Sequence, residues 1–133
     1  MGNPVMHFQL CVEDVDAMST FYREVFGWQI EPRRLTSVDA NVSGTYPIIE
    51  AEEGGIAGGI TDRIPTKGGA VLVIEVDDVD ATLERVVRLG GRKRFPETTP
   101  ERMALSADGG TDVRFEWQEF EDPEGNLVGI IQR

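Results

Sequence analysis

A six-residue segment occurs twice in the chain, and this repeat restricts the possible folds more than any other feature. VEDVDA at 12–17 returns as VDDVDA at 76–81, with five of six positions identical at an offset of 64. Each copy follows an apolar run and precedes a helical pattern that ends at a glycine, Gly27 in the first copy and Gly91 in the second. Open solenoids repeat many times with a period of about 20–50 residues. A longer period that occurs only twice indicates a duplicated module instead.

A second echo marks the end of each module. EGGIAGGI at 53–60 matches EGNLVGII at 124–131 at an offset of 71, which is seven more than the first offset. Segment 96–112 lacks clear periodicity and contains breaking residues, so we expect it to hold the extra residues as a loop. A proline and two glycines near the middle of the chain mark a boundary. The predicted modules are therefore residues 1–64 and 65–133.

Each module is predicted to run strand, helix, strand, strand, strand. In the first module we expect a strand at 6–12, a helix capped by Asp14 or Asp16 that ends at Gly27, and strands at 28–31, 47–51 and 55–60. In the second we expect a strand at 71–76, a helix near 80–89, and strands near 92–95, 113–120 and 127–131. This order predicts an α+β fold of two tandem βαβββ modules, whose curved mixed sheets surround a cleft.

Composition excludes several kinds of partner. Asp and Glu number 24 against 13 Lys and Arg, which gives a formal charge of −11. That charge disfavours nucleic acid and anionic membrane surfaces, which both bind through Lys and Arg. The single cysteine, Cys11, cannot form an intramolecular disulfide, and no apolar run approaches the ~20 residues of a membrane span. Because no signal peptide is visible either, we expect a cytoplasmic protein.

Three segments carry a family resemblance. HFQLCVEDVDAMSTFYREVFGWQI at 7–30, VIEVDDVDATLERVVRLGGR at 73–92 and DPEGNLVGI at 122–130 resemble the vicinal oxygen chelate superfamily, the group of glyoxalases, bleomycin resistance proteins and extradiol dioxygenases. The resemblance covers nearly the whole chain and implies two βαβββ modules that commonly assemble as dimers, so we expect a homodimer. The superfamily supports several chemistries and also binding without a reaction.

The resemblance also implies where a metal would sit. In metalloenzymes of this superfamily, up to four ligands come from the first and last strands of the two modules. The matching positions here are His7, Gly58, Val71 and Gly129, of which only His7 has a donor side chain. Catalytic zinc sites commonly use about three protein ligands. We therefore predict no cofactor and disfavour a divalent metal, although displaced carboxylates such as Glu75 remain an alternative.

Two residues are candidates for acid–base chemistry. Strand alternation puts His7 opposite Phe8, on the cleft side, where it could act as a general base or as a hydrogen-bonding group. The alternative is a strand histidine that a neighbour satisfies. Glu75 shares a face with Val71 and Val73, and its pKa would be raised if it were dry. The alternative for Glu75 is a solvated residue at the end of its strand.

The remaining candidates would line a pocket for a flat, apolar ligand. Aromatic side chains and small residues suit such a pocket, although most aromatic residues on strands only fill cores. The sequence does not tell which face of segment 113–120 is inward. The predicted ligand-binding residues are His7, Gln9, Trp28, Val71, Val73, Trp117 and Gly129.

Three functions compete on this basis. The leading hypothesis is a domain that binds a small, largely apolar or aromatic molecule between its modules without the usual metal, and the negative charge suits a cationic ligand. The second is a metal-dependent glyoxalase, isomerase or dioxygenase with His7 as one ligand. An enzyme here would be a lyase, an isomerase or a dioxygenase. The third is a noncatalytic protein-interaction module.

Overall fold

The computed structural model describes residues 2–38, 42–62, 69–94, 101–106 and 113–133. The first half of the chain contains β1 (Val5–Cys11), α1 (Val15–Phe26), β2 (Ile30–Glu31), β3 (Arg34–Ser37), β4 (Val42–Thr45), β5 (Ile48–Ile49) and β6 (Ala57–Thr61). The second half contains β7 (Ala70–Glu75), α2 (Val79–Arg88), β8 (Arg92–Lys93), β9 (Glu101–Ser106), β10 (Val113–Glu121) and β11 (Leu127–Gln132).

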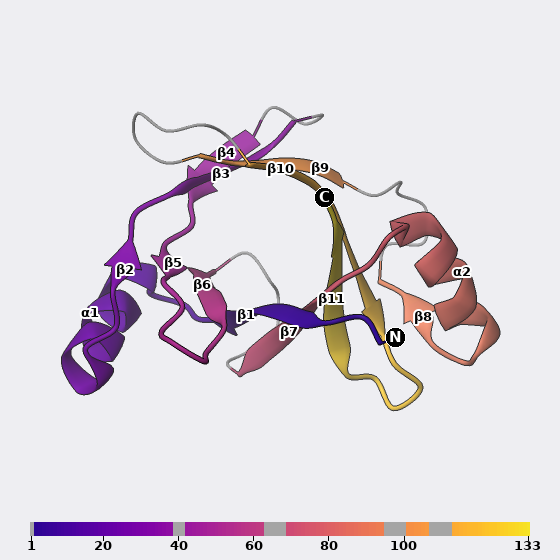
Figure 1. Cartoon of the computed structure of the whole chain (residues 1–133), viewed down its shortest axis with the longest axis horizontal. Coiled ribbons are helices and arrows are strands. Elements are labelled where there is room, and N and C mark those ends of the chain that lie inside the picture. Colours follow the sequence, from indigo (N-terminus) through magenta and orange to yellow (C-terminus); the bar gives the residue numbers. More distant parts are fainter. Residues whose placement is uncertain (1, 39–41, 63–68, 95–100, 107–112) are drawn as a thin grey trace.

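The strands form one curled mixed sheet with both helices outside it (Figure 1). Across the described residues the strand order is β2-β5-β6-β1-β7-β11-β10-β9-β3-β4, with β8 paired to β10. The first strands of the two halves, β1 and β7, pair antiparallel at its centre, and each has the last strand of its own half as a parallel neighbour. A second junction joins the halves where β3 pairs with β9. This architecture confirms the predicted fold class.

The structure differs from the prediction in three strands. β3 and β4 extend the first half, and β9 lies in segment 96–112, which was predicted to be a loop. That prediction is wrong for residues 101–106 because β9 has a strand on each side, β10 and β3, and this pairing compensates for its weak alternation. The predicted boundary between residues 64 and 65 lies outside the described residues.

The repeated acidic segment caps both helices. The Asp14 carboxylate accepts a hydrogen bond from the backbone N–H of Ala17 at 2.9 Å, and Asp78 does the same for Ala81 at 3.0 Å. These bonds satisfy donors that the first helical turn leaves unpaired. Gly27 ends α1 in the left-handed conformation, as predicted. After α2, the glycine with a positive φ is Gly90, not Gly91, at which the helical pattern was expected to end.

The two faces of the sheet have different environments. We call the face that the helices cover the outer face, and the opposite one the inner face. On the outer face α1 packs over the buried cluster of Ile30, Ile49 and Ile60, while α2 contributes Val79 and Leu83 to a second cluster. Of the described helices, neither is long and apolar enough to cross a membrane. Because the helices occupy the outer face, the candidate site residues of β1 and β7 lie on the inner face.

Candidate functional site

A row of inner-face residues crosses four neighbouring strands. His7 pairs with Val73, Val73 lies beside Gly129, and Gly129 pairs with Glu119. One step along β1, Gln9 pairs with Val71. The indole of Trp117 lies on the same wall, because a side chain added at Gly129 would meet it. The structure thus brings together six of the predicted site residues: His7, Gln9, Val71, Val73, Trp117 and Gly129.

Tyr46 organises the polar part of this wall. Its hydroxyl lies 2.9 Å from Nε2 of His7 and 3.0 Å from Nε2 of Gln9, which donates to it. The sequence offered Tyr46 only as one of several aromatic residues that could line a pocket, and it was not selected as a site residue; it lies in the short link between β4 and β5. His7, Tyr46 and Gln9 are called the polar triad below.

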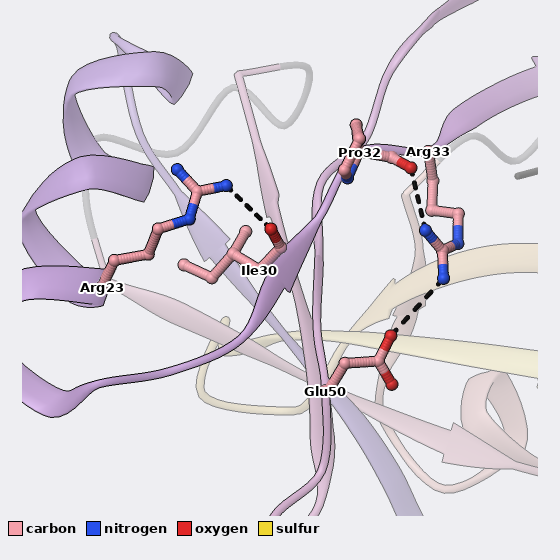
Figure 2. A network of polar contacts seen from close by, with 5 residues as sticks. All are labelled: Arg23, Ile30, Pro32, Arg33 and Glu50. Atoms are coloured by element: carbon pink, nitrogen blue, oxygen red, sulfur yellow. Dashed lines mark hydrogen bonds and ion pairs between the residues drawn. The ribbon is translucent and has the colours of Figure 1, made fainter. Parts of the chain in front are cut away.

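Two arginine side chains hold β2 and the segments next to it, close to the link that carries Tyr46 (Figure 2). The Arg23 guanidinium of α1 donates to the carbonyl of Ile30 at 2.7 Å. Arg33 contacts the Glu50 carboxylate at 3.5 Å and donates to the carbonyl of Pro32 at 2.9 Å. The backbone N–H of Tyr46 donates to the carbonyl of Arg33 at 2.9 Å. These bonds fix the backbone from which the Tyr46 ring reaches the inner face.

The polar triad is uncharged at neutral pH. Burial lowers the pKa of His7 to about 4, because the imidazolium form would lose its hydration. Burial likewise raises the pKa of Tyr46 above its usual value. The phenol accepts from Gln9, and when its own proton goes to Nε2 of His7 the imidazole proton lies on Nδ1; the opposite tautomer of His7 would donate to the phenol instead. Such a set can bind polar groups without supplying charge.

One acceptor of the polar triad is unused. Gln9 is 8% exposed, and its Oε1 is buried without a hydrogen-bond partner among the described residues. Leaving a buried acceptor unpaired costs about 1–3 kcal/mol, so such atoms call for a specific explanation. A donor on a bound molecule would remove this cost.

Aromatic rings cover two equivalent glycines of the inner wall. A Cβ atom at Gly59 would lie 2.2 Å from the hydroxyl oxygen and Cζ of Tyr46, and one at Gly129 would lie 2.2 Å from Cη2 of Trp117. The two glycines occupy equivalent places in the two halves. Gly59 lies beside Gln9, and Gly129 lies beside Val73, which is 64 residues after Gln9 and therefore its counterpart in the repeat. Each half thus stacks a ring on the glycine of its last strand.

This register corrects the predicted position Gly58. A Cβ there would lie 2.4 Å from Cζ of Phe8, whose ring packs in the outer cluster beneath α1. The last-strand offset is 129 − 59 = 70 rather than 71, so Gly59 takes the inner position. The similarity between segments 53–60 and 124–131 therefore aligns Gly58 with Gly129, although the inner-face counterpart of Gly129 is the next residue, Gly59.

The inner wall does not fit the metal site that the resemblance implies. Its four positions become His7, Gly59, Val71 and Gly129, and three of these have no donor side chain. No group of three or more His, Cys, Asp or Glu side chains in the described parts of the chain could hold an ion. The nearest carboxylate of the row, Glu119, lies 3.3 Å from the Arg94 guanidinium. No step through a metal follows from these residues.

Two other predicted residues lie apart from the polar triad. The Glu75 carboxylate binds Arg133 at 2.6 and 3.0 Å, and this contact lowers the pKa of Glu75. Glu75 is not dry, so the condition for a raised pKa is not met, and the alternative of a solvated residue at the end of its strand describes it better. Trp28 stacks on Tyr22 and Phe26 against α1, with ring centroids 5.3 and 5.2 Å apart, so it does not line the inner wall. The strand expected from residue 28 begins only at Ile30.

The lowered pKa of His7 makes stability depend on pH. Between pH 6.5 and about 4 the unfolded chain binds a proton that the native state does not, so stability falls as the pH falls through this window. We expect a loss of about 2 kcal/mol, allowing for partial exposure. Urea titrations at several pH values measure it, with His7→Gln as the control that lacks this slope. An imidazole that titrates near pH 6.5 by NMR would contradict the expectation.

Comparisons with known proteins agree with this architecture. A sequence model of the glyoxalase/bleomycin resistance protein/dioxygenase superfamily matches residues 5–130. A glyoxylase-like domain-containing protein of Didymella fabae is 32% identical over 129 residues, which cover 90% of this chain and 86% of that protein.

Solved structures resemble the chain in fold. A methylmalonyl-CoA epimerase in complex with methylmalonyl-CoA and NH4+ has a TM-score of 0.59 at 18% identity, covering 98% of this chain and 94% of the other. A hypothetical protein of Bacillus halodurans has a TM-score of 0.64 at 14% identity, covering 100% and 96%. A superfamily member of Vibrio splendidus has a TM-score of 0.54 at 14% identity, covering 99% and 100%. At these identities the likeness concerns the fold alone.

Proposed function

Because the chain belongs to the glyoxalase/bleomycin resistance protein/dioxygenase superfamily, we propose that it binds a small, largely apolar or aromatic molecule on its inner wall without a metal. The ligand would carry an N–H or O–H group. The observation that carries this proposal is the buried, unpaired Oε1 of Gln9 beside the hydroxyl of Tyr46. A ligand donor there would complete the polar triad.

The charge of the wall supports a neutral or cationic ligand. His7 is uncharged at neutral pH, and Arg94 faces the carboxylate of Glu119. The protein as a whole carries a formal charge of −11, which repels anions at long range. Val71 and Val73 are almost fully buried, so the partly exposed indole of Trp117 would contact the rest of the molecule.

A thermal-shift screen against small aromatic amines, amides and phenols tests the proposal. A ligand at 100 times its dissociation constant should add about 2.7 kcal/mol of stability. Replacing Gln9 by leucine removes the acceptor at similar volume, so ligands with a donor should bind at least ~10-fold more weakly. The control is Gln29→Leu, since Gln29 is exposed between α1 and β2.

Two outcomes would reject it. One is a screen without any stabilising compound. The other is a metal that copurifies in stoichiometric amount and is lost in His7→Ala, because that result would favour the metalloenzyme. The similar epimerase structures hold methylmalonyl-CoA or 2-nitronate-propionyl-CoA, and the present residues give no reason to expect an acyl-CoA ligand here.

We also propose a homodimer, which would cover an apolar face of α1. Phe21, Val25 and Phe26 are more than half exposed although they are large and hydrophobic. Exposed apolar side chains that cluster on one element mark contact surfaces. Sedimentation equilibrium decides the question: a chain that remains monomeric at high micromolar concentration would reject the dimer.

A further inference from the structure

The hydroxyl of Tyr46 has a single proton, and two neighbouring side chains are able to accept it. Its oxygen lies 2.9 Å from Nε2 of His7 and 3.0 Å from Nε2 of Gln9, and both are hydrogen-bond distances. Tyr46 is 5% exposed, and its hydroxyl has no third partner among the described residues. The phenol proton therefore has two possible destinations, His7 and Gln9.

These destinations define two hydrogen-bond states of the polar triad. In the first state, the amide of Gln9 donates to the phenol, and the phenol donates to Nε2 of His7, whose own proton then lies on Nδ1. In the second state, the amide is rotated by half a turn, so that its Oε1 accepts from the phenol while Nε2 of His7 donates to it. The states differ by one amide rotation and by the position of one imidazole proton.

The two states present opposite polarity at the buried end of the polar triad. In the first state this end holds Oε1 of Gln9, an acceptor that is buried without a partner among the described residues. In the second state the NH₂ group takes its place and offers a donor. The other end tolerates both states. His7 is only partly buried, and Nδ1 is not among the buried atoms that lack a partner, so solvent can accept from it or donate to it.

The imidazole stays neutral in both states. Burial lowers the pKa of His7 to about 4, so at neutral pH the ring carries one proton, which can lie on either nitrogen. The imidazolium form could not switch, because both of its nitrogens are donors. The polar triad therefore changes polarity without a change in charge.

We infer that the inner wall binds aromatic carbonyl compounds as well as molecules with an N–H or O–H group, because the polar triad inverts its hydrogen bonds to match the ligand. A donor on the ligand meets Oε1 of Gln9 and selects the first state. A carbonyl oxygen at the same place meets the rotated amide and selects the second state, with the proton of His7 on Nε2. The inference rests on the proposed inner-wall ligand and extends its chemical class from donors to acceptors.

Three bicyclic probes of similar shape test the inference on the full chain. Indole offers only an N–H donor, 1-indanone only a carbonyl acceptor, and indene neither. Titrations followed by ¹H–¹⁵N spectra give the dissociation constants, and long-range ¹H–¹⁵N spectra show which imidazole nitrogen carries the proton. His7 is the only histidine of the chain, so its ring signals are unambiguous.

Both polar probes are expected to bind at least ~3-fold more tightly than indene, since each gains a hydrogen bond at Gln9. The proton of His7 should lie on Nδ1 in the free protein and in the indole complex, and on Nε2 in the 1-indanone complex. The direction of this change follows from the single proton of Tyr46.

A matched pair of variants tests the role of the phenol. Tyr46→Phe keeps the ring that covers Gly59 but removes the hydroxyl, so 1-indanone should no longer change the position of the His7 proton. Tyr22→Phe makes the same chemical change at the other tyrosine of the chain, which stacks on Trp28 away from the inner wall. This control should leave the response to 1-indanone unchanged.

Several results would overturn the inference while leaving the binding of donors intact. They are 1-indanone that binds no more tightly than indene, 1-indanone that binds without moving the His7 proton, and an equal response in both tyrosine variants. A proton on Nε2 in the indole complex would also overturn it, because the donor would then not meet Oε1 of Gln9. If indole too binds no more tightly than indene, the proposed inner-wall ligand fails together with the inference.

Discussion

Gly59→Ala is expected to destabilise the protein by about 3 kcal/mol, although it adds a single methyl group. The new Cβ would lie 2.2 Å from the hydroxyl oxygen and Cζ of Tyr46. Tyr46 is 5% exposed and bonded to His7 and Gln9, so its ring cannot move aside without breaking the polar triad. Chemical denaturation measures the loss.

The matched control is Gly2→Ala, because a Cβ at Gly2 meets nothing within 4 Å. Combining Gly59→Ala with Tyr46→Ala should cost less than the sum of the two single variants, since the ring that the methyl group strikes is then absent. Additive costs would show that Tyr46 does not cover Gly59, and the polar triad would lose its geometric basis.

Leu83→Ala is expected to cost about 3 kcal/mol or more, through lost burial and the cavity that remains. Leu83 is 2% exposed and packs with Val76, Val79 and Ile130 between α2 and the sheet. Leu89→Ala serves as the control with the same chemical change, because Leu89 is 73% exposed. Similar costs for both variants would mean that α2 does not pack on the sheet through this face.

The repeat, the helix patterns and the family resemblance together predicted the fold class, because all three can be read directly from the sequence. Asp14 and Gly27 act where their side-chain chemistry predicts. β9 could not be predicted in the same way, since it owes its strand conformation to β10 and β3, which are distant in the sequence. Long-range pairing of this kind leaves little trace in the periodicity of a short segment.

The site could be predicted only where it depends on strand alternation, and not where it depends on contacts between distant segments. Alternation along β1 placed His7 and Gln9 on one face, as the structure has them. Tyr46 was only one of several aromatic candidates and could not be singled out, because its role depends on the glycine it covers. The signal that could have found it is an aromatic residue 12 or 13 positions before an inner glycine, since Trp117 precedes Gly129 as Tyr46 precedes Gly59. The contact between Trp117 and Gly129 also shows which face of β10 points inward, and the sequence alone could not show this.

The pairing of β3 with β9 has a consequence for motion and for unfolding. Because the halves are hydrogen-bonded both at β1–β7 and at β3–β9, neither can swing about a single hinge while the other stays still. The ligand proposed for the inner wall would then enter through side-chain rotation or local strand fraying, not through domain opening. Denaturation should accordingly be one cooperative event, with identical midpoints for reporters in either half.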